Sequence, residues 1–190
     1  MGVNILIEKQ RSETLEAVIK TCKSDSGVCG KKLRDAHFLA GTLLGEEILN
    51  NYDEKSYAVI IMMRAGLPFG LGIADSLEHE KTVRVFFYCD GQILSDSLNT
   101  KDFDKIIIVD AVIRTGQAML DLTERLVVRE KIILATNVID ERSITNFTGL
   151  QVFAVRSSKH SYIGSDQKYI ENGKGPDTGD RLFRSDFLTA

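Results

Sequence analysis

The chain has 190 residues, of which 43% are hydrophobic and 27% are charged, and its formal net charge is −3 at pH 7. This length supports one well-packed core, so we expect a single domain over residues 1–190. The negative charge argues against nucleic acid as a partner. No apolar run approaches the roughly 20 residues of a membrane span, and the N-terminal residues lack the apolar core of a signal peptide. We therefore expect neither a nucleic-acid nor a membrane partner.

The three cysteines, Cys22, Cys29 and Cys89, do not form an even-numbered framework, and they lack the spacing of zinc ligands. We therefore expect free thiols in a reducing, cytoplasmic environment. The histidines are scattered along the chain. Nothing in the sequence predicts a metal site built from protein ligands.

Apolar periodicity predicts strands that alternate with helices. We expect strands at residues 4–8, 57–63, 82–88, 106–109, 131–138 and 150–155. We expect helices at residues 14–21, 31–50 and 68–78, a fourth from Thr115-Gly116, and a short fifth that begins at Ile139. Because most strands are apolar on both faces, the pattern predicts an α/β fold with a largely parallel central sheet flanked by helices. Residues 89–104 should form an exposed excursion, and the last 35 residues a loop-rich tail.

The stretch Lys105–Met119 combines two features that suit a charged ligand. Its buried strand ends at Asp110, and an amphipathic helix opens after Thr115-Gly116. A carboxylate at a strand end can hold a hydroxyl group or a metal, and the N–H groups of a helix start can hold a phosphate. An ordinary strand–helix turn with Thr115 as the helix cap explains the same residues equally well.

A second candidate lies after the strand at residues 57–63, where Arg64 is followed by Ala65 and Gly66. Ligands of open α/β sheets bind beyond the carboxyl ends of the strands. An arginine there can grip a phosphate with two hydrogen bonds, and a glycine lets the backbone approach the same anion. The G-x-G-x-x-G and G-x-x-x-x-G-K-[ST] nucleotide motifs and the G-x-S-x-G nucleophile turn are absent.

Three segments in the same order resemble the uracil phosphoribosyltransferase family of the type I phosphoribosyltransferases. Met63–Leu67 resembles its R-A-G-L turn, and Asp110–Gly116 resembles its D-P-M-L-A-T-G motif. Asp177–Phe183 resembles its C-terminal D-A-G-D-R-x-F motif. The resemblance implies transfer of a phosphoribosyl group from 5-phosphoribosyl 1-diphosphate to uracil, with Mg²⁺ on the donor's own oxygens, and a homodimer.

The resemblance also assigns binding residues. The ribosyl donor would contact Arg64, Ala65, Asp110, Ala111, Val112, Ile113, Arg114, Thr115, Gly116, Gln117, Ala118 and Asp177. Within this set, Asp110 would hold the ribose hydroxyls, residues 114–118 the 5′-phosphate, and Arg64 with Ala65 the diphosphate. Uracil would be read around Ile170, Pro176, Asp177 and Thr178. The resemblance implies no catalytic nucleophile.

The chain departs from the family pattern at several of these positions. Arg114 replaces a small residue, Gln117-Ala118 replaces Gly-Ser, and Cys89 stands near the place of a diphosphate-binding arginine. Pro176 resembles a one-residue insertion beside the base. Two alternatives therefore stay open: a regulatory homologue that binds a ribose phosphate or nucleotide without turnover, and a phosphoribosyltransferase for another base.

Overall fold

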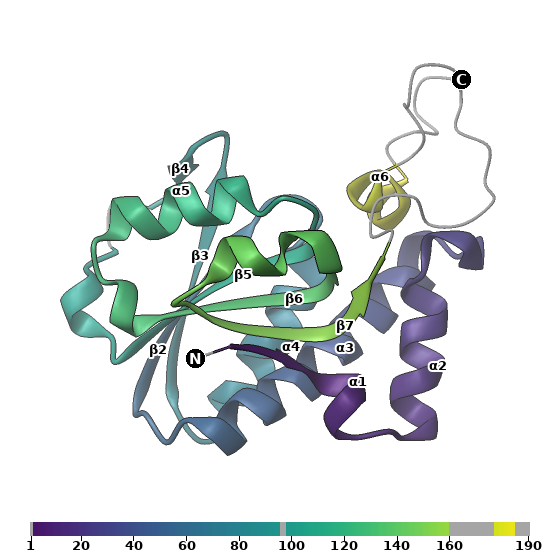
Figure 1. Ribbon diagram of the computed structural model, residues 1–190, viewed down its shortest axis with the longest axis horizontal. Helices are drawn as coiled ribbons and strands as arrows, with labels where there is room; N and C mark the ends of the chain where they lie inside the picture. Colours follow the sequence, from purple (N-terminus) through teal and green to yellow (C-terminus); the bar gives the residue numbers. More distant parts are fainter. Residues whose placement is uncertain (1, 96–97, 160–176, 185–190) are drawn as a thin grey trace.

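The computed structural model describes residues 2–95, 98–159 and 177–184, and within them the chain forms a sheet with helices on both faces (Figure 1). The strands are β1 (Val3–Ile5), β2 (Ser56–Met62), β3 (Thr82–Cys89), β4 (Gln92–Ile93), β5 (Lys105–Ile113), β6 (Ile132–Asp140) and β7 (Gln151–Ser158). The helices are α1 (Leu6–Lys9), α2 (Glu13–Cys22), α3 (Gly30–Asn51), α4 (Leu67–Glu78), α5 (Gln117–Leu126) and α6 (Thr178–Phe183). Short 3₁₀ segments are η1 (Ser24–Ser26), η2 (Thr100–Asp102), η3 (Arg129–Lys131) and η4 (Glu141–Phe147).

The strands run in the order β1-β7-β6-β5-β2-β3-β4. Every neighbouring pair is parallel except β3 and β4, which form a short antiparallel hairpin. The expectation of a largely parallel sheet flanked by helices is therefore confirmed. Because the central strands are parallel, the carboxyl ends of β2 and β5 lie side by side. The two candidate turns thus meet at one edge of the sheet.

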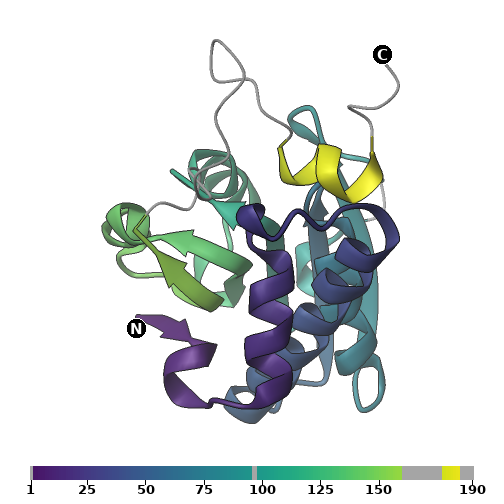
Figure 2. The same ribbon diagram turned by 90° about the vertical axis from the view of Figure 1, so that its right-hand side faces the viewer.

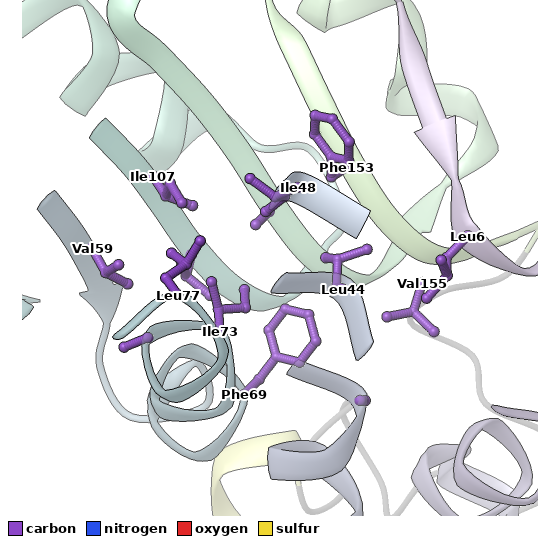
Figure 3. Packing of buried hydrophobic residues seen from close by; sticks show 14 of the residues in the cluster. Leu6, Leu44, Ile48, Val59, Phe69, Ile73, Leu77, Ile107, Phe153 and Val155 are labelled. Atoms are coloured by element: carbon purple, nitrogen blue, oxygen red, sulfur yellow. The ribbon is translucent and has the colours of Figure 1, made fainter. Parts of the chain in front are cut away.

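Two apolar layers cover the sheet. Helices α2, α3 and α4 pack on one face, and α5 with η4 packs on the other (Figure 2). On the first face, Leu44 and Ile48 of α3 and Phe69 of α4 are fully buried and face the sheet (Figure 3). Successive residues of β5 point into opposite layers: Ile107 packs in the first and Ile108 in the second. This two-sided burial explains why the strands are apolar on both faces.

Several element boundaries differ from the expectations. The strand expected at 4–8 ends at Ile5, because only three residues pair with β7, and Leu6 turns its side chain into the core from α1. The strand expected to end at Asp110 continues to Ile113, paired with β6 throughout. The helix expected from Ile139 is wrong, since β6 runs to Asp140 and a 3₁₀ segment follows.

Two further expectations can be compared with the structure. All three cysteines are free, as predicted. The C-terminal tail contains a short helix, α6, that the glycine-rich pattern did not predict. Among the residues that the structure describes, no helix is long and apolar enough to cross a membrane.

Candidate functional site

The turn between β2 and α4 carries Arg64 and Ala65. Gly66 holds this turn against the neighbouring strand, since a Cβ atom there would lie 2.6 Å from the Met62 carbonyl oxygen and 3.0 Å from that of Val109. The Arg64 side chain is 50% exposed. The turn that carries it lies against β5, because a Cβ atom on Gly66 would also lie 3.3 Å from the Cα atom of Asp110. The peptide bond between Met63 and Arg64 is cis. The close packing of Gly66 therefore brings the arginine to the strand that carries the candidate carboxylate.

The second turn follows β5. Asp110, Ala111, Val112 and Ile113 lie within the strand, and Arg114 and Thr115 are exposed in the bend after it. Gly116 is the N-cap of α5, with a φ of 75°, and it supplies no capping side chain. The Gln117 N–H lies 3.4 Å from the Thr115 hydroxyl oxygen, a long contact. The first N–H groups of α5 are therefore available to an anion that lies over the bend.

Segment η4 packs against the bend at Thr115-Gly116. A Cβ atom on Gly116 would lie 2.1 Å from Cζ of Phe147, so the aromatic ring packs directly against the glycine. The Asn146 side chain donates a hydrogen bond of 3.2 Å to the Thr115 carbonyl oxygen. Neither supporting residue was predicted from the sequence. Both lie about 30 positions along the chain, outside the motif that marked the bend.

Helix α6 brings the C-terminal motif to the same edge. Asp177 is its N-cap, and Oδ1 of Asp177 accepts the Asp180 N–H at 2.7 Å in a capping box. Asp180 Oδ1 in turn lies 3.0 Å from Nη2 of Arg64. Gly179 lies beside the same guanidinium, since a Cβ atom there would be in ordinary van der Waals contact, at 3.6 Å, with Arg64 Nη2. Asp180 is a site residue that the motif contained but that sequence reasoning did not single out.

The electrostatics of Asp110 reflect this assembly. Burial of the carboxyl group raises the pKa of Asp110 to about 7. The N–H groups of Ala111 and Val112 lower this pKa, and the negative charge of Asp177 raises it. The Ala111 N–H bond to Asp110 Oδ1 measures 2.7 Å. The structure therefore places two predicted residues, Asp110 and Asp177, within electrostatic reach of each other.

The remaining predicted residues lie in different surroundings. Gln117 donates from its side chain to Asp121 along α5, at 2.6 Å. Ala118 is exposed in the first turn of α5, and Thr178 opens α6. Cys89 ends β3 and pairs with Gln92 in the hairpin. The predicted base contacts Ile170 and Pro176 lie outside the described residues.

A metal ion would find few protein ligands at this edge of the sheet. Within residues 2–95, 98–159 and 177–184, no group of three histidine, cysteine, aspartate or glutamate side chains is arranged to hold a metal ion. Mg²⁺ prefers phosphate oxygens and water to all-protein cages. The residues present would fit an ion held mainly by the oxygens of a bound phosphate group.

Taken together, the Arg64 guanidinium, the start of α5 and the carboxylates of Asp110 and Asp177 gather at the edge of the sheet where β2 and β5 end. Arg64 and the start of α5 can bind phosphate groups at two separate points. Asp110 lies on the strand between them and can accept hydrogen bonds from sugar hydroxyls. This arrangement suits a sugar that carries a phosphate group at each end.

Comparison with known proteins agrees with this geometry. A family model described as uracil phosphoribosyltransferase matches residues 37–185. A search of curated protein sequences finds no match. Among solved structures, the chain is similar to the AQ2163 protein from Aquifex aeolicus, with a TM-score of 0.66 and 18% identity over 96% of this chain and 98% of that one.

Two named phosphoribosyltransferases share the fold. Orotate phosphoribosyltransferase from Mycobacterium tuberculosis, solved with 5-phospho-α-D-ribosyl 1-diphosphate, gives a TM-score of 0.54 at 14% identity, covering 82% of this chain and 96% of that one. A hypoxanthine-guanine phosphoribosyltransferase from Bacillus anthracis gives 0.50 at 12% identity, covering 66% and 78%. At such identities the likeness shows the fold alone. Because the family model spans most of the sequence and the sheet agrees with these structures, the chain belongs to the uracil phosphoribosyltransferase family and is a phosphoribosyltransferase that acts on a nucleobase.

Proposed function

We propose that the chain transfers the phosphoribosyl group of 5-phosphoribosyl 1-diphosphate to uracil, giving uridine monophosphate and diphosphate. One observation carries the proposal: the Arg64 turn, the Asp110–Gly116 segment and Asp177 meet at one edge of the sheet. These are the three motifs of the family, far apart in the sequence and close together in space. The family match over residues 37–185 supports the same reading.

Each group then has a role that its position suits. The N–H groups of residues 114–118, with the Thr115 hydroxyl, bind the 5′-phosphate, and Asp110 accepts hydrogen bonds from the ribose hydroxyls. Arg64, with the Ala65 backbone, binds the diphosphate. Mg²⁺, carried on the donor's oxygens, neutralises part of the diphosphate charge. The remaining donor contacts proposed are the backbone of Ala111, Val112 and Ile113 and the Asp177 carboxylate.

The reaction exchanges one bond at the anomeric carbon for another. The bond from C1′ to the diphosphate oxygen breaks, and diphosphate leaves with the electron pair. The bond from C1′ to N1 of uracil forms, and the N1 proton is lost. Positive charge builds on the sugar as the first bond breaks, so the nearby carboxylates favour the transition state and catalysis rests on positioning and electrostatics. No protein nucleophile is required.

Uracil is proposed to bind beside Asp177 and Thr178 at the start of α6, with Ile170 and Pro176 completing the pocket. The direct test is incubation with donor, Mg²⁺ and a panel of pyrimidines and purines, with nucleotide products separated by chromatography. We expect uridine monophosphate and diphosphate in equal amounts. The matched control is Asp110→Asn, which preserves the shape of the side chain and removes its charge. An absence of product with every base would refute the enzyme reading.

A binding or regulatory role without turnover is the second candidate. It is favoured by Gln117, whose side chain bonds to Asp121, and by Ala118, which offers no hydroxyl to the phosphate. This role predicts that calorimetry detects binding of the donor or a nucleotide while no product forms. A third reading, transfer to another base, would be identified by product formation with a different member of the panel.

We also propose a homodimer, as in the family. Light scattering at several protein concentrations would measure its mass. A constant mass of one 21.2 kDa chain would contradict this proposal.

A further inference from the structure

Helix α6 is held in place by contacts from the rest of the protein. It contains only six residues, and an isolated helix of this length is unstable in water. Its Leu182 side chain is fully buried, and the Leu182 carbonyl oxygen accepts a hydrogen bond of 2.7 Å from Nη1 of Arg34 in α3. The orientation of α6 is therefore decided by what it packs against (Figure 2).

Arg181 makes the most extensive of these contacts. Its side chain is almost completely buried, and Nη2 lies 3.0 Å from the Lys23 carbonyl oxygen, 3.0 Å from that of Val28 and 3.3 Å from Oγ of Ser26. All three acceptors belong to the connection between α2 and α3, more than 150 positions earlier in the chain. A buried guanidinium gains more from such bonds than an exposed one, because water does not compete for them.

The surroundings of Arg181 show that these oxygens are its main partners. Within the described part of the chain, no carboxylate lies within ion-pair distance of it. Its neighbours include Cys22 and His37. Burial, together with the charges of Arg181 and Arg156, lowers the pKa of His37 to about 3, so His37 is neutral. The guanidinium is thus held by backbone and hydroxyl oxygens at one defined place.

Asp180 of α6 and its N-cap, Asp177, reach the candidate site. Asp180 contacts Arg64, and Asp177 lies close enough to Asp110 to affect its titration. We propose that Arg181 is a positioning residue: by tying α6 to the connection between α2 and α3, it places Asp180 against Arg64 and Asp177 near Asp110. The activity part of this inference rests on the proposed function, but the placement of the two aspartates does not. The connection at Lys23–Cys29 thereby becomes a structural support of a site to which it contributes no ligand.

The test uses Arg181→Lys in the full chain. Lysine keeps the charge but is shorter, so its ammonium group cannot take the position of Nη2, from which all three oxygens are reached. The matched control is Arg129→Lys, an exposed arginine on η3 whose Nη2 bonds to the Thr148 carbonyl oxygen. The first readout is the pKa of Asp110, measured by NMR from the chemical shift of its carboxyl carbon across a pH titration. The reference is Asp177→Asn, which removes the charge and retains an N-cap side chain.

We expect Arg181→Lys to lower the pKa of Asp110 in the same direction as Asp177→Asn. Combining the two changes should add little, because both act through the Asp177 carboxylate. The second readout is kcat/KM, which should fall by about 10²-fold, the effect of displacing a site group by about 1 Å. Arg129→Lys should leave both readouts unchanged.

The proposal is overturned if Arg181→Lys folds and leaves the Asp110 titration unchanged, or if the double variant shows the full sum of both shifts. Equal losses in Arg129→Lys would also overturn it.

If Arg181→Lys does not fold, Ser26→Ala provides a second test, because it removes one acceptor of the Arg181 guanidinium. It must shift the pKa of Asp110 in the same direction by a smaller amount, and the absence of a shift overturns the proposal. A wild-type protein that makes no product contradicts the proposed enzyme, while the Asp110 titration still tests Arg181.

Discussion

Asp180 Oδ1 lies 3.0 Å from Nη2 of Arg64, and this ion pair joins the C-terminal helix to the turn proposed to bind diphosphate. Arg64 is half exposed and Asp180 is 28% exposed, so the pair contributes at most about 1 kcal/mol to stability. A diphosphate that binds Arg64 must share it with this carboxylate. The free protein therefore keeps its arginine oriented by an internal anion.

Asp180→Asn should increase the affinity for the ribosyl donor. Removing the carboxylate ends its competition for Arg64 and removes a negative charge near an anionic ligand. We expect the Kd measured by calorimetry to fall by up to about fivefold, matching the roughly 0.2–1 kcal/mol of an exposed ion pair. Asp53→Asn, which removes another exposed ion pair, that with Lys81, is the matched control and should leave the Kd unchanged. An unchanged or higher Kd for Asp180→Asn would mean that Arg64 does not bind the diphosphate.

Asp110 predicts a pH dependence of stability. An ordinary aspartate has a pKa of 3.8, and burial raises the pKa of Asp110 in the folded protein to about 7. The folded state therefore holds more protons than the unfolded state between pH 4 and 7, and the contribution of Asp110 to stability falls as the pH rises through this window. Asp110→Asn should remove this fall. Denaturant unfolding of both proteins at pH 4.5 and 7.5 measures it, and parallel pH profiles would show that Asp110 is not buried as described.

His37 predicts the opposite trend. Burial lowers its pKa from 6.5 to about 3, so the unfolded state binds the extra proton and stability falls as the pH drops from 6.5 toward 3. The loss is on the order of 4–5 kcal/mol at pH 3. Among the described residues, neither ring nitrogen has a hydrogen-bond partner, so His37→Leu should leave stability at pH 7 unchanged or raised. The variant should also lose the acid sensitivity in denaturant unfolding at pH 4 and 7. A variant that is less stable at pH 7 would reveal a bond to the imidazole.

Gly116→Ala tests the support under the phosphate bend. Gly116 has a positive φ, and a Cβ atom there would overlap the Phe147 ring, so alanine introduces both backbone strain and displacement of the ring. Gly91→Ala is the matched control, because Gly91 has a φ of 83° and nothing within 4 Å of its Cβ position. We expect the control to cost about 1 kcal/mol and Gly116→Ala clearly more, measured by denaturant unfolding. Equal costs would mean that the ring moves aside freely.

Much of this arrangement could be predicted from the sequence, because the relevant information is local. The apolar strands, the carboxylate of Asp110 and the glycine turns are read from neighbouring residues, and the parallel order of strands brings their ends together. The extension of β5 to Ile113 could not be read, because apolar residues after Asp110 fit a strand or a loop equally well. Asp110 consequently lies inside a strand, where burial changes its titration.

The contacts that complete the site are non-local. Asp180 and Arg64 are 116 positions apart, and Arg181 meets the connection between α2 and α3 across more than 150 positions. No periodicity or motif encodes such pairs. Phe147 under Gly116 is another example, since an aromatic residue in a 3₁₀ segment has no local signal for what it supports. The motifs thus predict which residues gather, and the tertiary fold decides how they are oriented.

Ala118→Ser should strengthen binding of the donor's 5′-phosphate. Ala118 is exposed in the first turn of α5, whose N-cap residue, Gly116, has no side chain, so a serine hydroxyl there could donate to a phosphate over the bend. A net gain of 0.5–1.5 kcal/mol, typical of one added hydrogen bond, lowers the Kd about two- to tenfold. Ala17→Ser, at an exposed position of α2, controls for the effect of serine in a helix and should leave the Kd unchanged. If calorimetry finds the same Kd for Ala118→Ser as for the wild type, the phosphate does not bind at the start of α5.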